Sequence, residues 1–112
     1  MALKVYILKG TIGAGSPETE LDILTTPSGR ERRLQEVRVY TSQTSGVEVR
    51  LYKNLDMLCQ ITSEVNNLLK LPYSVTEVLA EGDKLRLTAI NSGTSDSDVI
   101  VEVVVDEVAT PT

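Results

Sequence analysis

The feature that most restricts the fold is an apolar side chain at every second residue, repeated in short runs along the chain. Every second residue from Val99 to Val105 is valine, and between 47 and 51 apolar residues alternate with Glu48 and Arg50. Successive side chains of a β-strand point to opposite faces of its sheet. This period of two therefore predicts half-buried strands, with one face in a core and the other in water.

Eight runs of this kind follow one another, and turn residues separate them. They cover residues 3–9, 20–25, 32–41, 47–53, 57–61, 73–80, 84–90 and 99–105. Gly82 lies between two of them, where it can take the positive φ of a tight turn. A chain of 112 residues is expected to form one domain. We predict an all-β, eight-stranded antiparallel jelly-roll or Greek-key sandwich over residues 1–108, with a frayed tail at 109–112.

Residues 54–70 fit two descriptions. Their apolar residues have helical spacing, with Asn54 as the cap of a long helix and Pro72 beyond its end. Alternatively, residues 57–61 form a strand paired with the preceding strand through a turn at Asn54, and a helix is confined to 63–70. We favour the second description, because strands that follow one another are usually adjacent in space. The predicted fold then contains at most one short helix.

The run at 32–41 contains a change of phase. Val37 and Val39 alternate with charged residues and are expected to face inward, but Leu34 falls out of step with them. An extra residue inserted into a strand produces such a change. We therefore predict a β-bulge or a bend near Gln35.

Several classes of function lack the residues that they need. The chain has no histidine and a single cysteine, Cys59, so neither a Cys–His nucleophile nor an internal disulfide can form. The net charge of −5 opposes binding to a phosphate backbone. No apolar run approaches the roughly 18 residues of a membrane span, and residues 1–9 lack the pattern of a signal peptide. We predict a protein that is not an enzyme and binds no cofactor, nucleic acid or membrane.

Three groups of side chains need separate consideration. Asn91, Asp96 and Asp98 offer oxygen ligands in one loop, but their spacing is not that of an EF-hand and no glutamate closes it, so no metal site is predicted. A short basic cluster consists of Arg30, Arg32 and Arg33. These arginines either bind an acidic face of a neighbouring subunit or lie in solvent at the end of a strand. Tyr40 and Tyr52 lie on the outward phase of two strands that are expected to be neighbours. Together their rings could form a small platform that binds a sugar or another ligand.

The second half of the chain contains a hairpin of residues 37–39 with 47–51, the segment 66–69 before Leu71-Pro72-Tyr73, and a turn and strand at 81–85 followed by Asn91. In this order of features, residues 32–107 resemble small viral and bacteriophage jelly-roll domains. The resemblance implies a structural part of a particle: a capsid shell, a decoration or cement protein, or a tail or fibre tip. It also implies a trimer or another symmetric oligomer, with no catalytic residue.

The first and last predicted strands are apolar on the phase that water usually occupies. With the odd-numbered residues of the first strand taken as inward, Tyr6 and Leu8 point outward, and so do Ile100 and Val104 of the last strand. Since the first and last strands of a jelly roll are commonly neighbours, we expect these four side chains to form one patch for self-association. The alternative is that the loop at 10–17 or the helix at 63–70 covers them.

These observations predict a non-catalytic structural protein that acts through self-association and contacts with other proteins of a particle. We expect a virion component such as a capsid decoration protein, most simply a trimer, made in the host cytoplasm and located in the phage particle. The alternative is a cellular, cytoplasmic β-sandwich module that binds carbohydrate or another ligand.

Overall fold

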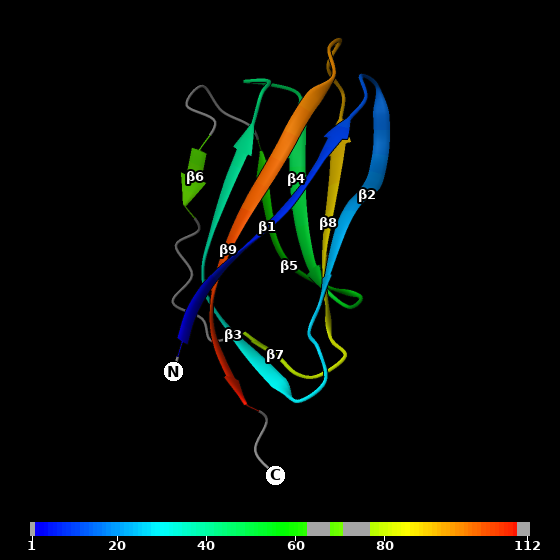
Figure 1. The fold of residues 1–112 in the computed structure, drawn as a ribbon. Coiled ribbons are helices and arrows are strands. Elements are labelled where there is room, and N and C mark those ends of the chain that lie inside the picture. Colours follow the sequence, from blue (N-terminus) through cyan, green and yellow to red (C-terminus); the bar gives the residue numbers. More distant parts are fainter. Residues whose placement is uncertain (1, 63–67, 71–76, 110–112) are drawn as a thin grey trace.

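The computed structural model describes residues 2–62, 68–70 and 77–109, and all regular structure within these ranges is β-strand. Two antiparallel sheets pack face to face with the hydrophobic core between them (Figure 1). No helix in these ranges has the length and apolarity needed to span a membrane. The predicted all-β sandwich is confirmed.

Each sheet has four strand positions. Sheet A contains, in spatial order, β1 (Ala2–Ile12), β9 (Ser97–Ala109), β3 (Arg30–Thr41) and, on the far edge of β3, two short segments, β6 (Leu68–Lys70) and β7 (Val78–Leu79). These segments pair with different parts of β3 and so share one position. Sheet B contains, in spatial order, β2 (Ser16–Thr25), β8 (Lys84–Asn91), β4 (Val47–Lys53) and β5 (Asp56–Thr62).

The chain passes from one sheet to the other at almost every connection. Among the described strands, only the consecutive pairs β4–β5 and β6–β7 belong to the same sheet. The first strand, β1, and the last, β9, are neighbours over eleven paired residues, from Ala2 opposite Glu107 to Ile12 opposite Ser97. This strand order is that of a jelly roll, the predicted fold.

The expected hairpin of residues 37–39 with 47–51 is wrong. β3 belongs to sheet A and β4 to sheet B, so the turn at 42–46 crosses the sandwich. The inward valines of both strands do meet, but they meet across the core. Alternation shows that one face of a strand is buried, whereas it does not show whether the next strand lies beside it or opposite it.

The core consists of the inward side chains of both sheets. Sheet A contributes the valines of β3 and β9, and sheet B contributes valine, leucine and alanine from β4 and β8: Val37, Val39, Val99, Val101, Val103, Val105, Val47, Val49, Leu51, Leu85, Leu87 and Ala89. All of these are buried. Full burial of a valine or leucine side chain stabilises a fold by about 1.5–3 kcal/mol.

The predicted bulge is confirmed. The pairing of β3 with β9 shifts register between Leu34 and Glu36, so Gln35 is the extra residue. Leu34 is buried before the shift, and Val37 and Val39 are buried after it. Inward positions are therefore even-numbered before the bulge and odd-numbered after it.

The strand description of residues 57–61 is confirmed. β5 pairs with β4 through a turn in which Asn54 has a φ of 55°. Residues 68–70 form strand β6 rather than the end of the expected helix. The rest of that segment, 63–67, and residues 73–76 of the next expected strand lie outside the described residues. The turn at 81–83 has a φ of 86° at Gly82, as predicted.

Several strands are longer than the sequence pattern suggests, and the extensions of β1 and β9 matter most for the core. β1 continues to Ile12, three residues beyond its predicted end, and the side chain of Ile12 is buried in the core. β9 continues to Ala109, which pairs with Arg30 and therefore belongs to the sheet rather than to a tail. Both extensions change which residues face the core.

Candidate functional site

The phase of β1 is opposite to the expected one. Leu8 is only 1% exposed and packs in the core, and Tyr6 is half-buried against it. Leu3, Val5 and Ile7 point outward instead, with 68%, 59% and 58% of their surface exposed. Leu8 is therefore not a surface contact and Tyr6 points inward, so the predicted four-residue patch does not exist in that form.

The error has a simple physical origin. Both phases of residues 3–9 are apolar, so the strand gains similar burial whichever face it turns inward. The deciding side chain is Ile12, which shares the phase of Tyr6 and Leu8 and fills the core at the other end of β1. If the predicted strand is extended to Ile12, its second half is more apolar at the even-numbered residues, and the sequence then favours turning Tyr6 and Leu8 inward.

An apolar surface nevertheless exists on the outer face of sheet A. Val5 lies opposite Val104, and Ile100, opposite Lys9, is diagonal to Ile7. Ile100 and Val104 do face outward as predicted, and both are half-buried. We call the following five side chains the outer patch: Leu3, Val5, Ile7, Ile100 and Val104. Glu102, which lies opposite Ile7 and pairs with Arg38, separates Ile100 from Val104 on β9. Exposed apolar side chains gathered in this way usually mark an association site.

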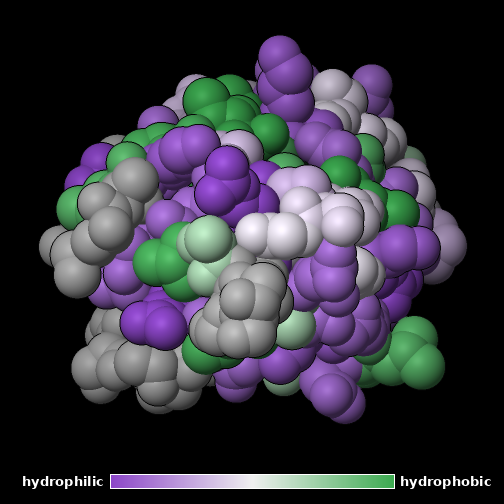
Figure 2. Space-filling view, turned by 60° about the horizontal axis from the view of Figure 1, so that its bottom comes forward, coloured by the Kyte–Doolittle hydropathy of each residue, from purple (hydrophilic) through white to green (hydrophobic). Residues whose placement is uncertain are grey.

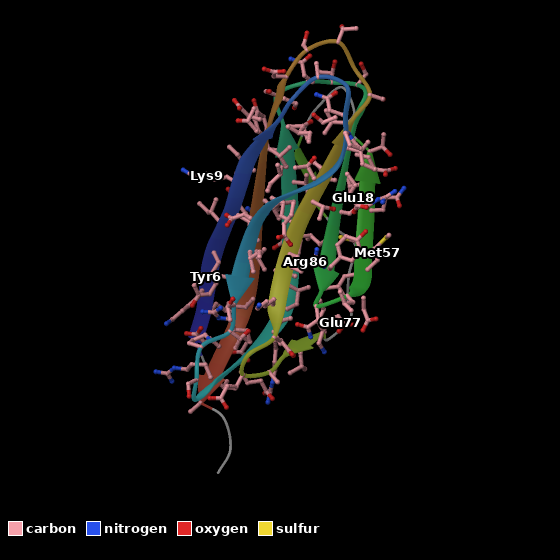
Figure 3. The ribbon with its side chains drawn as sticks, turned by 90° about the vertical axis from the view of Figure 1, so that its right-hand side faces the viewer. Tyr6, Lys9, Glu18, Met57, Glu77 and Arg86 are labelled. Carbon is pink, nitrogen blue, oxygen red and sulfur yellow. The ribbon has the colours of Figure 1, made fainter. Side chains whose placement is uncertain are left out.

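The outer patch lies at one side of the sandwich. Figure 3 views the two sheets from the side, with Lys9 of β1 and Met57 of β5 at opposite sides. The end of the sandwich at the bottom of Figure 1 is more polar than the outer patch. Figure 2 shows that most residues at this end are hydrophilic and that the hydrophobic ones form separate groups.

The three arginines at the start of β3 do not form one basic surface. Arg30 and Arg33 are exposed, and Arg33 pairs with Glu31 at 3.1 Å. Arg32 is buried, because it precedes the bulge and so shares the inward phase of Leu34. The expectation that Arg32 contacts a ligand or partner is therefore wrong.

The buried Arg32 is held by groups from three other strands. Its Nε lies 2.8 Å from Glu107 Oε1 of β9, and its Nη1 donates to the Thr25 carbonyl of β2 at 3.1 Å. The guanidinium lies 4.2 Å from the ring centroid of Tyr6, whose hydroxyl donates to Glu107 at 2.7 Å. Lys4 Nζ lies 2.8 Å from the other oxygen of Glu107. These contacts close one end of the sandwich.

Sequence reasoning missed Glu107 altogether. A usable signal existed, since the inward stripe of odd-numbered residues in β9 continues from Val105 to Glu107. A carboxylate in that phase needs a cation from a neighbouring strand. Arg32 supplies it, and Lys4 adds a second one.

The pH dependence of stability follows from this carboxylate. Hydrogen bonds from Lys4, Arg32 and Tyr6 lower the pKa of Glu107 from its ordinary value of 4.5 to about 2. Because the folded-state pKa is lower than the unfolded one, the contribution of Glu107 is fully present above the unfolded pKa and is lost as the pH falls through the folded pKa. We expect urea midpoints to fall between pH 5 and pH 2, and to fall less in a Glu107→Gln variant. An equal fall in both proteins would contradict this role.

The two tyrosines expected to form a platform lie on opposite faces of the molecule. Tyr40 belongs to β3 on the outer face of sheet A, and Tyr52 belongs to β4 of sheet B. Because β3 and β4 are not neighbours in one sheet, no single sugar can stack on both rings. The predicted platform is wrong for the same reason as the predicted hairpin.

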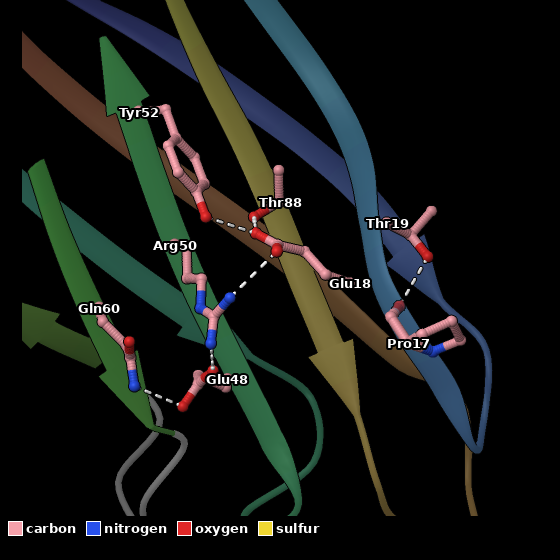
Figure 4. A network of polar contacts seen from close by, with 8 residues as sticks. All are labelled: Pro17, Glu18, Thr19, Glu48, Arg50, Tyr52, Gln60 and Thr88. Carbon is pink, nitrogen blue, oxygen red and sulfur yellow. Dashed lines mark hydrogen bonds and ion pairs between the residues drawn. The ribbon is translucent and has the colours of Figure 1, made fainter. Parts of the chain in front are cut away.

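Tyr52 belongs to a polar network on the outer face of sheet B (Figure 4). Glu18 accepts hydrogen bonds from Tyr52 and Thr88, both at 2.7 Å, and its other oxygen lies 3.0 Å from Arg50 Nη1. Arg50 also pairs with Glu48 at 2.7 Å. The hydrogen bonds from Tyr52 and Thr88 lower the pKa of Glu18. The network joins β2, β8 and β4.

A hollow of about 350 Å³ opens beside this network, lined by Glu18, Glu20, Tyr52, Leu55, Arg86 and Thr88. The Arg86 guanidinium lies 5.5 Å from the centroid of the Tyr52 ring and also pairs with Glu20. A sugar entering the hollow would have to displace these contacts. We therefore assign no ligand to it.

The polar loop at 91–98 joins strand ends. Asn91 is buried and donates to the carbonyls of Ile12 and Ser95, while Asp96 accepts from the Ala14 amide and Asp98 from the Thr11 hydroxyl. Among the described residues, no three cysteine, aspartate or glutamate side chains come together to hold a metal ion. Burial raises the pKa of Cys59 to about 11, which keeps its thiol protonated and unreactive at neutral pH.

No protein-family model matches the chain, and no curated protein is significantly similar to it in sequence. Arguments about function therefore rest on the residues themselves, chiefly on the outer patch.

Proposed function

We propose that this is a non-catalytic structural protein that assembles through sheet A, on the side where β1 carries its exposed apolar side chains. The observation that carries the proposal is the exposure of three successive outward side chains of β1, Leu3, Val5 and Ile7. The opposite side of the sandwich has the pattern of a solvated face, since carboxylates and arginines pair with one another there. On sheet A, Arg38 of β3 forms pairs of the same kind, so the apolar exposure is concentrated at β1 and supports association there.

We further propose that the assembly is a virus-like particle, with this chain as a component such as a capsid decoration protein and other capsid proteins as partners. Two observations support this. The strand order is that of a jelly roll, which is common among capsid domains. The second is the resemblance of residues 32–107 to phage jelly-roll domains, which now rests on the turn and strand at 81–85 followed by Asn91, since β3 and β4 form no hairpin. Genomic neighbourhood tests it: flanking capsid or tail genes would support the assignment, and flanking metabolic genes would oppose it.

Self-association is tested directly by light scattering. At concentrations of about 100–500 µM, where weak specific interfaces form, we expect a mean mass above the 12.2 kDa of one chain. The double variant Val5→Glu and Val104→Glu should be monomeric, because it places charges in the middle of the outer patch. Met57→Glu, a matched control on the opposite side, should associate normally. A strictly monomeric wild type would contradict the proposal.

A further inference from the structure

β1 is the edge strand of sheet A, and among the described strands only β9 pairs with it. The Lys9 amide donates to Asp22 Oδ2 at 3.1 Å, so it points away from β9. On the other side of β9, the Ser42 amide bonds to the Asp98 carbonyl at 3.0 Å. Main-chain groups of alternate residues point to opposite sides of a strand. Both bonds therefore place the amides and carbonyls of odd-numbered residues in β1 on its free edge.

Between Leu3 and Ile7, no hydrogen bond from the described part of the chain reaches this edge, and the three outward side chains are exposed. β2 approaches this edge near Lys9 and Gly10, where the position of a Gly10 Cβ would be 2.8 Å from the Cβ of Leu21. The pairing of β1 with β9 contains no bulge that would turn the edge aside. An exposed, regular, apolar edge strand is a template for another strand.

We propose that two copies of this chain pair antiparallel through their β1 edges, with Val5 of one copy opposite Val5 of the other. This rests on the proposed self-association and names its partner and geometry. Sheet A then continues through both copies around a two-fold axis. Leu3 lies opposite Ile7 of the second copy, and every odd-numbered pair supplies main-chain hydrogen bonds. The pairing replaces the trimer that the resemblance to phage proteins implies.

Charge and steric cover favour this register over its two neighbours. One shift places Lys4 opposite Lys4 of the second copy, and like charges directly opposite destabilise a sheet. The other shift places Leu3 opposite Lys9, whose amide is already bonded to Asp22. With Val5 opposite Val5, Lys4 faces Tyr6 of the second copy, and its charge is balanced by Glu107 at 2.8 Å.

The size of the contact sets its strength. Seven paired residues, Ala2 to Leu8, span roughly 23 Å of strand. Such a contact buries less than the roughly 1,600 Å² of a standard stable interface. We therefore expect a reversible dimer with a dissociation constant in the micromolar range, in equilibrium with the monomer.

Disulfide trapping tests the register. In a Cys59→Ala background, Val5→Cys is incubated with oxidised glutathione and examined by non-reducing electrophoresis. Residues that form a hydrogen-bonded antiparallel pair have Cα atoms about 5.5 Å apart, within disulfide range. Val104→Cys in the same background is the matched control. In the proposed dimer its two copies are three strand spacings apart, about 14 Å, which is beyond disulfide range.

Covalent dimers from Val5→Cys, at least tenfold more abundant than from Val104→Cys, are the expected result. If only Val104→Cys is trapped, the outer faces stack and the edge pairing is overturned, while the proposed self-association survives. Equal trapping of both variants indicates random collision and also overturns the pairing. A wild type that stays monomeric in light scattering removes both proposals together.

Discussion

Replacing Leu8 with alanine is expected to lower the free energy of unfolding by about 2–5 kcal/mol, the cost of a cavity at a fully buried leucine. Leu8 is 1% exposed and packs against the core between the two sheets. Urea or guanidinium denaturation, monitored by far-ultraviolet circular dichroism, measures the change. The m-value should stay close to that of the wild type if the variant keeps the same fold.

The matched control for this variant is its neighbour on the same strand. The side chain of Ile7 is as large and as apolar as that of Leu8, but 58% of its surface is exposed. Ile7→Ala should therefore change stability by less than about 1 kcal/mol. The opposite ranking of the two variants would mean that β1 turns its other face to the core, as the sequence pattern alone suggested.

Replacing Arg32 with alanine is expected to destabilise the protein by about 3–5 kcal/mol, as when one partner of a buried ion pair is removed. Arg32 and Glu107 have side chains only 6% and 7% exposed, and their contact joins β3 to β9. The substitution also removes the hydrogen bond to Thr25 and the contact with the Tyr6 ring. Thermal unfolding at neutral pH measures the loss as a lower midpoint.

Arg33→Ala is the matched control, one position along the same strand. Its side chain is 48% exposed and its ion pair with Glu31 is on the surface. Pairs of this kind contribute about 0–1 kcal/mol, so the variant should resemble the wild type. Similar losses from both substitutions would show that Arg32 is not buried in the folded protein.

The two faces of the sandwich differ in a way that bears on assembly. On sheet B, Glu18 and Glu48 pair with Arg50, and Glu20 pairs with Arg86, so charges there are balanced within one chain. On sheet A, the strand at the edge has apolar side chains facing water and an open row of main-chain groups. Assembly through sheet A would leave the polar face of sheet B exposed to solvent.

Much of the fold could be predicted from the sequence, because local patterns determine it. The apolar residues of β4 alternate with charged residues, and the valines of β9 form an unbroken stripe whereas its other phase contains Glu102, so each strand has one preferred buried face. The bulge at Gln35 follows from the mismatch of Leu34 with Val37, and the turn at Asn54 follows from the two flanking apolar runs. In each case the information lies within a few residues of the chain.

The candidate site was decided by the tertiary structure. β1 is apolar on both phases, so only the space left in the core, filled by Leu8 and Ile12, selects its inward face. Whether the strand after β3 lies beside it or across the core depends on the whole strand order, and this separates Tyr40 from Tyr52. Arg32 is buried because Glu107, 75 residues away in the chain, lies beside it. The sequence by itself determined which strands have a buried face, whereas long-range packing decided which apolar and charged side chains remain on the surface.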